Sequence, residues 1–152
     1  MVRNLLLAAE RDIGTERMAY LFLVSYLFLL RVPSEALPMQ RGGDIGSHDR
    51  AAQSVLYLED SGTVCLRLRS RKNRPEGSVL RRSCACSACP KICPVHGLWF
   101  NFFHKLPVGA QPWSDVTPSS AISSLRQCLA ALSVRLTAFP PSFVQACHFA
   151  TR

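Results

Sequence analysis

The chain has 152 residues, which suits one domain with a sizeable hydrophobic core. Apolar residues make up 48% of it and charged residues 18%, a balance that excludes wholesale disorder of the charge-rich kind. Lysine and arginine number 18 against 10 acidic residues, so a polyanionic partner is favoured, nucleic acid first and an anionic membrane surface second.

The first part of the chain is predicted to contain two helices, over residues 4–10 and 15–30, separated by Gly14. The second helix is apolar on almost every side, which indicates a helix buried at the centre of the molecule. Pro33 is expected to end it at Arg31, because proline has no amide hydrogen and disfavours helix for the residue before it.

The apolar segment over residues 18–30 also has the length of the hydrophobic part of a signal peptide. The acidic residues Glu10, Asp12 and Glu16 lie where such a signal needs positive charge, and no small-residue cleavage site follows. The segment is also shorter than the ~20 residues that span a bilayer. A buried helix is therefore preferred to a signal or a membrane anchor.

The middle of the chain is predicted to form a small antiparallel sheet. A short helical turn over residues 34–39, capped by Ser34, and a glycine-rich loop come first. Residues 54–58 and 63–69 then alternate in polarity around a turn, and residues 78–82 offer a third strand. The fold class is thus α+β, mainly α, with a helical core and a two- or three-stranded antiparallel sheet at about residues 54–82.

The last part of the chain is predicted to be helical until it becomes irregular. Residues 94–104 are rich in aromatic side chains and form one expected helix. Thr117 is a suitable N-cap for another, with Pro118 at its first position. Apolar residues follow at helical spacing: Ile122, Leu125, Leu129 and Leu132. We expect one domain over residues 1–134 and an irregular, poorly ordered tail over residues 135–152.

Basic residues are concentrated on the predicted sheet and its second turn. Those expected to contact a nucleic-acid backbone are Arg67, Arg69, Arg71, Arg74, Arg81 and Arg82. The alternative interpretation is a solvated basic face that has no ligand.

Seven cysteines leave one thiol unpaired in any complete set of disulfides, which favours a reducing compartment or a metal site. The candidate ligands follow the last predicted strand closely: Cys84, Cys86, Cys89, Cys93 and His96. They suffice for a structural zinc ion, although their spacing is not a regular zinc motif, and thiols packed in a core are the alternative.

The order of these parts resembles the first half of a tyrosine recombinase (integrase) catalytic domain of the type found in eukaryotic mobile elements. The family has a helix that leads into a "tGLRxSEl" segment, and "FLLRVPSEAL" matches it with Arg31 and Glu35, one residue further apart. The resemblance implies that Arg31 contacts the scissile phosphate, with Glu35 in support. It also implies that a lysine in the turn of a small sheet protonates the leaving oxygen, a role for which Lys72 is the candidate and Arg71 and Arg74 are rivals.

The chemistry is reasonable on physical grounds, because a phosphodiester transition state is an oxyanion that a fixed guanidinium and an ammonium both stabilise. The alternative for Arg31 is a cation at the helix C-terminus that pairs with Glu35. Mobile-element recombinases also carry a stretch similar to "CACSACPKICPVH" after the lysine hairpin. The resemblance covers about residues 18–132.

The second half of the family's active site has no match. The family needs a His-x-x-Arg box and then a tyrosine nucleophile, whereas His148 and Arg152 are spaced differently and no tyrosine follows Tyr57. The family's N-terminal DNA-clamping domain has no counterpart before residue 18. We therefore expect a DNA-binding remnant of a DNA recombination and integration enzyme that does not cleave DNA, is intracellular and nuclear, and needs no cofactor or small-molecule substrate.

Two alternatives belong to other classes. One is a small membrane-anchored or secreted cysteine-rich protein that uses residues 18–30 as its signal or anchor. The other is a decayed reading frame with no selected function. The sequence does not indicate the oligomeric state or the DNA target.

Overall fold

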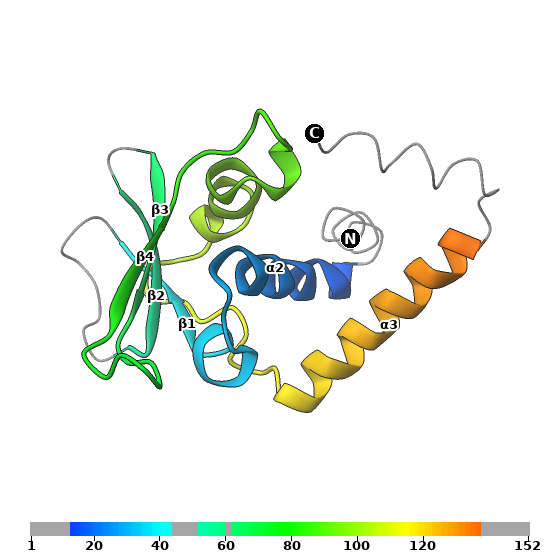
Figure 1. Ribbon diagram of the computed structural model, residues 1–152, viewed down its shortest axis with the longest axis horizontal. Coiled ribbons are helices and arrows are strands. Elements are labelled where there is room, and N and C mark those ends of the chain that lie inside the picture. The colour runs from blue at the N-terminus through cyan, green and yellow to red at the C-terminus, as the bar shows by residue number, and fades with distance from the viewer. Residues whose placement is uncertain (1–12, 44–51, 60–61, 138–152) are drawn as a thin grey trace.

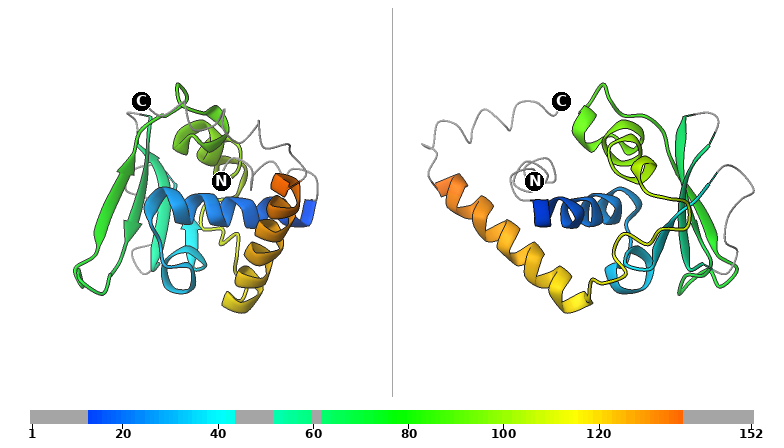
Figure 2. Two further views of the ribbon diagram at one scale, coloured as in Figure 1. Left: turned by 45° about the vertical axis from the view of Figure 1, so that its right-hand side comes forward. Right: turned by 180° about the vertical axis from the view of Figure 1, so that it is seen from behind.

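The computed structural model describes residues 13–43, 52–59 and 62–137. Helix α2 (Ile13–Phe28) lies in the middle of the molecule, with a sheet on one side and helix α3 (Pro118–Thr137) on the other (Figure 1). Viewed from a second direction, α3 crosses α2 at a steep angle (Figure 2). The fold is α+β, as the sequence predicts, with short helical turns packed above and below α2.

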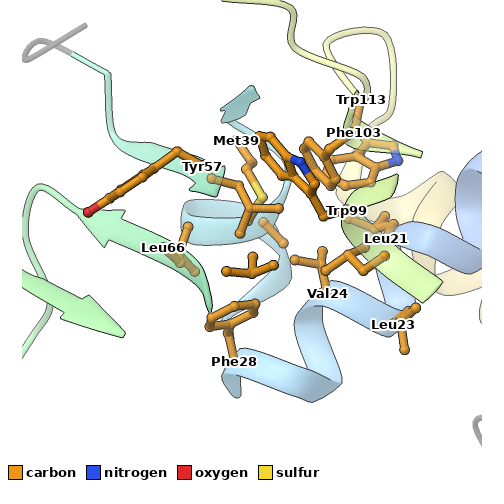
Figure 3. Packing of buried hydrophobic residues seen from close by; sticks show 14 of the residues in the cluster. Leu21, Leu23, Val24, Phe28, Met39, Tyr57, Leu66, Trp99, Phe103 and Trp113 are labelled. Carbon is orange, nitrogen blue, oxygen red and sulfur yellow. The ribbon is translucent and has the colours of Figure 1, made fainter. Parts of the chain in front are cut away.

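Helix α2 is buried on several faces, which explains its unbroken apolar sequence. Leu21, Leu23 and Val24 are each completely buried, although adjacent positions on a helix point in different directions. In the close view Leu21 and Val24 lie beside Trp99 of the aromatic segment that follows the sheet, whereas Leu23 points away from it (Figure 3). Among the described residues, no helix combines the length and the apolar character that a bilayer crossing needs.

The end of α2 differs from the prediction. The helix ends at Phe28, because Leu29 adopts a left-handed conformation with φ +53°. The amide of Leu30 donates to the carbonyl of Ser25 and that of Leu29 to Tyr26, a Schellman arrangement that turns the chain away. Pro33 lies beyond this turn and is not what ends the helix.

The predicted turn with Ser34 as its cap is also displaced. A single wide π-helical turn, η1 (Val32–Ala36), begins two residues earlier, with Arg31 at its N-cap position. Its hydrogen bonds join residues five apart, from Ala36 to Arg31 and from Leu37 to Val32.

In the described residues the sheet has four strands in the order β1-β2-β3-β4: β1 (Met39–Arg41), β2 (Ser54–Glu59), β3 (Thr63–Leu68) and β4 (Ser78–Arg82). The predicted hairpin and third strand are confirmed as β2, β3 and β4, which pair antiparallel. The prediction missed β1, which pairs parallel to β2. Its other edge is covered, because the amide of Arg41 donates to Ala110 and the amide of Gly109 to Arg41.

The aromatic segment is divided into short turns: η2 (Pro90–Ile92), η3 (Pro94–Phe100) and η4 (Phe103–Lys105). A single helix over residues 94–104 was wrong, because the chain breaks at Phe102, which has non-helical backbone angles. Trp99, Phe103 and Trp113 fill the core beside α2 (Figure 3). The indole of Trp113 also donates to the carbonyl of Arg17 at 2.9 Å and so ties this segment to α2.

Helix α3 begins as predicted. Thr117 caps it, since the Thr117 hydroxyl accepts from the amide of Ser120 at 3.2 Å. The helix continues to Thr137, three residues into the predicted irregular tail. The rest of that tail, residues 138–152, and the predicted helix over residues 4–10 lie outside the described residues.

Candidate functional site

A fully buried carboxylate, that of Glu35, organises the first candidate site. It accepts from the amide of Arg31 at 2.9 Å and from the Nη2 of the same residue at 2.9 Å. It also accepts from Arg71, whose Nε lies 3.1 Å from Oε1 and whose Nη2 lies 3.3 Å from Oε2. Two guanidinium groups therefore share one carboxylate.

Burial alone would raise the pKa of Glu35, but the hydrogen bonds from Arg71 and Arg31 outweigh it and the net shift is downward. The backbone is anchored as well, since the Ser54 hydroxyl on β2 donates to the carbonyl of Glu35 at 2.6 Å. Glu35 is thus an ionised and rigidly held group.

The two arginines come from separate elements. Arg31 precedes η1, whereas Arg71 lies in the turn between β3 and β4, where its amide and carbonyl exchange hydrogen bonds with those of Arg74 at 2.8 and 2.9 Å. The Nη2 of Arg71 also donates to the carbonyl of Leu29 at 3.2 Å. The β3–β4 turn is thereby fastened to the end of α2.

Beside this pair is an open hollow of about 340 Å³ that is lined by Arg31, Arg71, Lys72, Asn73 and Arg74. Four of these side chains are cationic and none is acidic. The side chain of Arg31 is 52% exposed and that of Arg71 28%. The hollow can receive an anion, because the guanidiniums are held in place by Glu35 and still reach solvent.

The structure therefore brings together Arg31, Lys72 and, behind them, Glu35, the three residues that the sequence singled out. It also brings Arg71 and Arg74 to the same hollow. The direct contact between Arg71 and Glu35 was missed. No sequence signal could have revealed it, because it depends on the way the β3–β4 turn folds onto η1.

The other arginines of the basic set do not line this hollow. Arg67 and Arg69 line a neighbouring pocket that also contains Glu76. Arg81 lies at the far end of the hairpin, where its Nη2 is 3.3 Å from Glu59. Arg82 points toward the helix layer: its Nε donates to the carbonyl of Leu27 at 2.8 Å and its guanidinium lies over the ring of Phe28.

The second candidate site is a cluster of four possible metal ligands: Cys84, Cys86, Cys93 and His96. Their ligand atoms all lie within 4.8 Å of one another. Cys84 and Cys86 follow β4 directly, whereas Cys93 is the N-cap residue of η3 and His96 lies in its first turn. Cys89 was expected among the ligands but is not part of this cluster.

Three of the separations match tetrahedral coordination, and that between Cys86 and His96 is shorter. Zinc bonds of about 2.3 Å to sulfur and 2.0 Å to nitrogen place the ligand atoms about 3.5 to 3.8 Å apart. The sulfurs of Cys93 and Cys84 are 3.7 Å apart. The Nδ1 of His96 lies 3.5 Å from Cys84, 3.7 Å from Cys93 and 3.0 Å from Cys86. The cluster can hold a metal ion.

The backbone around Cys93 supports a thiolate. Burial raises the pKa of this thiol, but hydrogen bonds from the amides of His96 and Ala85 to its sulfur more than compensate and lower it to about 6. Burial and the neighbouring sulfurs of Cys93 and Cys84 raise the pKa of Cys86 to about 12. Without a cation, the thiolate of Cys93 therefore disfavours ionisation of Cys86.

Comparison of the chain with models of known protein families, with curated proteins and with solved structures gave no match.

Proposed function

We propose that this protein binds DNA through its backbone phosphates, as a relative of the tyrosine recombinases, and acts in the nucleus. The observation that carries the proposal is the position of Arg31, which buried Glu35 fixes at the rim of a hollow that Lys72 and Arg74 also line. A guanidinium oriented in this way binds a phosphate with less loss of side-chain entropy than a free surface arginine. The order of a core helix, this arginine, a hairpin and a turn lysine is that of the family.

Strand cleavage by this chain alone is not part of the proposal. The family's reaction needs a tyrosine hydroxyl as nucleophile. Tyr57, the last tyrosine in the sequence, lies in β2 and is 7% exposed, so its hydroxyl is poorly placed to reach a bound phosphate.

The test is the salt dependence of binding to a short DNA duplex, measured by fluorescence anisotropy. The logarithm of the binding constant should fall linearly with the logarithm of salt concentration, because each neutralised phosphate releases counterions. Neutralising Lys72 and Arg74 together should make this slope shallower by roughly two. These two side chains are exposed, so the fold should tolerate the change.

Arg81→Gln is the matched control, because this arginine lies at the other end of the hairpin and pairs with Glu59. It should leave the slope closer to that of the unaltered protein than the double variant does. Absence of binding at low salt, or equal slopes for the Lys72/Arg74 variant and the unaltered protein, would remove the proposal.

The metal centre belongs to the same proposal. We infer that its ion is zinc in a structural role, because three sulfurs and one imidazole nitrogen form a closed four-ligand set with no position left for a substrate. The ion would tie the end of β4 to η3.

Metal content tests this inference directly. The purified protein should hold one zinc per chain, and cobalt substitution should give the absorption spectrum of a tetrahedral thiolate site. Cys93→Ser should lose the ion, whereas Cys89→Ser should keep it. Equal retention by both variants would contradict the four-ligand assignment.

A further inference from the structure

The two guanidinium groups bound to Glu35 have the same pattern of occupied nitrogens. Arg31 uses Nε and Nη2, both toward Oε1 of Glu35. Arg71 uses Nε toward Glu35 and Nη2 toward both Glu35 and the carbonyl of Leu29. In the described part of the chain, neither Nη1 has a protein partner.

Each Nη1 carries two hydrogens, so the pair keeps four N–H donors in reserve. Both arginines line the same hollow. One carboxylate balances only one of the two positive charges, and nothing acidic lines the hollow in front of them. The arrangement is complementary to an anion with several oxygens, since two nitrogens at fixed positions can each donate to a different oxygen.

Glu35 also explains how two like charges are kept together. Two neighbouring guanidiniums repel each other. If both side chains were mobile, the binding of an anion would have to offset this repulsion and also the side-chain entropy lost when they become ordered. Here the buried carboxylate offsets the repulsion before any ligand arrives. Lys72, by contrast, is exposed and ends in a flexible ammonium, which attracts an anion by its charge but holds no hydrogen-bond donor in a fixed direction.

We propose that Arg31 and Arg71 form a two-guanidinium clamp for a single phosphodiester group, with Glu35 as the positioning residue and Arg71, rather than Lys72, as the second phosphate contact. The clamp rests on the proposed function for its natural ligand, DNA. Both of its arginines come from this chain, so it does not depend on a His-x-x-Arg box.

The experiment compares charge-conserving variants. Arg71→Lys and Arg31→Lys keep the positive charge but lose the planar guanidinium with its several fixed N–H donors. Each should weaken binding of a short DNA duplex about ten-fold or more. Arg81→Lys is the matched control, because Arg81 does not line the hollow and pairs with Glu59 at the other end of the hairpin. It should change the affinity less than two-fold. Equal affinities for Arg71→Lys and the unaltered protein would overturn the clamp.

This result is separable from failure of the proposed function. If the unaltered protein binds the duplex with the expected salt slope and Arg71→Lys binds equally well, only the clamp is wrong. If the unaltered protein does not bind the duplex, DNA is not the ligand, and titration with inorganic phosphate then decides whether the clamp exists.

Arg71 also fastens the β3–β4 turn to Leu29, so its variant can lose stability. A measurement on the unaltered protein avoids this difficulty. In NMR spectra the Nε–Hε signals of Arg31 and Arg71 should both shift on titration with inorganic phosphate, and that of Arg74 should shift less. If the signals of Arg31 and Arg71 stay in place at phosphate concentrations that shift those of Arg74, the clamp is refuted.

Discussion

Leu29 combines an exposed side chain with a backbone conformation that suits glycine. Its φ is +53° and its side chain is 74% exposed, so the Schellman turn costs about 1 kcal/mol or more and gains little burial in return. We expect Leu29→Gly to raise the free energy of unfolding by about 1 kcal/mol, measured by urea denaturation. Leu29→Ala removes the same side chain and keeps the strain, so it should lie close to the unaltered protein. A less stable glycine variant would show that the leucine side chain contributes more than its exposure indicates.

Glu35 links stability to pH. Its pKa is lowered in the folded protein from the usual 4.5. Its contribution to the stability of the folded protein is therefore fully present above pH 4.5 and is lost as the pH falls through the lower, folded-state pKa. Glu35→Gln should therefore cost about 2 kcal/mol at neutral pH, and the difference from the unaltered protein should shrink in acid. Chemical denaturation at a series of pH values measures this.

Glu76→Gln, at an exposed position in the β3–β4 turn, is the control for that series and should leave the pH profile nearly unchanged. A constant difference between Glu35→Gln and the unaltered protein from neutral to acidic pH would mean that folding does not lower the pKa of this carboxyl.

At the scale of elements, the contact between η2 and η3 depends on Gly97. A β-carbon at this position would overlap the carbonyl oxygen of Lys91, a backbone atom that cannot move alone. We expect Gly97→Ala to destabilise the protein by about 1 to 3 kcal/mol and to weaken metal binding, because η3 contains His96 and begins at its N-cap residue Cys93. Thermal unfolding and a competitive zinc titration measure the two effects.

Ser87→Ala, in the exposed loop before η2, is the control and should change neither the stability nor the zinc affinity. An unaltered zinc affinity in the Gly97 variant would show that metal binding does not depend on the packing of η3.

These elements could be predicted from the sequence where they depend on residues close together in the chain, and not where they depend on contacts between distant residues. The hairpin of β2 and β3 follows from alternating polarity around a turn, and the start of α3 from the Thr117 cap. Strand β1 was missed because it has three residues, and residues 42–53 separate it in the sequence from its pairing partner, the start of β2. The end of α2 was misplaced because Pro33 is a visible helix breaker, whereas a leucine in the left-handed conformation leaves no signal in the sequence.

The same distinction holds for the sites. The pairing of Arg31 with Glu35 is visible in the sequence, because they are four positions apart, about one helical turn. Arg71 joins them only through the fold of a distant hairpin. Spacing likewise places five possible ligands near one point, but it does not fix the directions of their side chains, so it could not show that Cys89 lies outside the cluster.

At the scale of the whole molecule, the two sites hold opposite ends of strand β4. The turn before the strand is tied to Glu35 through Arg71, and the cysteines that follow it reach Cys93 and His96. Strand β4 is at the edge of the sheet and pairs only with β3 among the described strands. The contacts at both ends therefore limit fraying of this edge, and a ligand at either proposed site should stabilise the folded protein.

Stabilisation of the folded protein by a bound ligand gives a prediction for thermal unfolding. A ligand that binds only the folded state, present at a hundred times its dissociation constant, stabilises it by about 2.7 kcal/mol, which in a protein of this size raises Tm by roughly 5 to 10 °C. Duplex DNA in low salt should produce such a shift, and about 1 M salt should abolish it, because the chain's net charge of +8 is then screened within about 3 Å. The Lys72/Arg74 double variant should show a smaller shift at the same DNA concentration. A shift that persists in high salt would indicate apolar or base-specific contacts in place of the phosphate contacts proposed for the hollow.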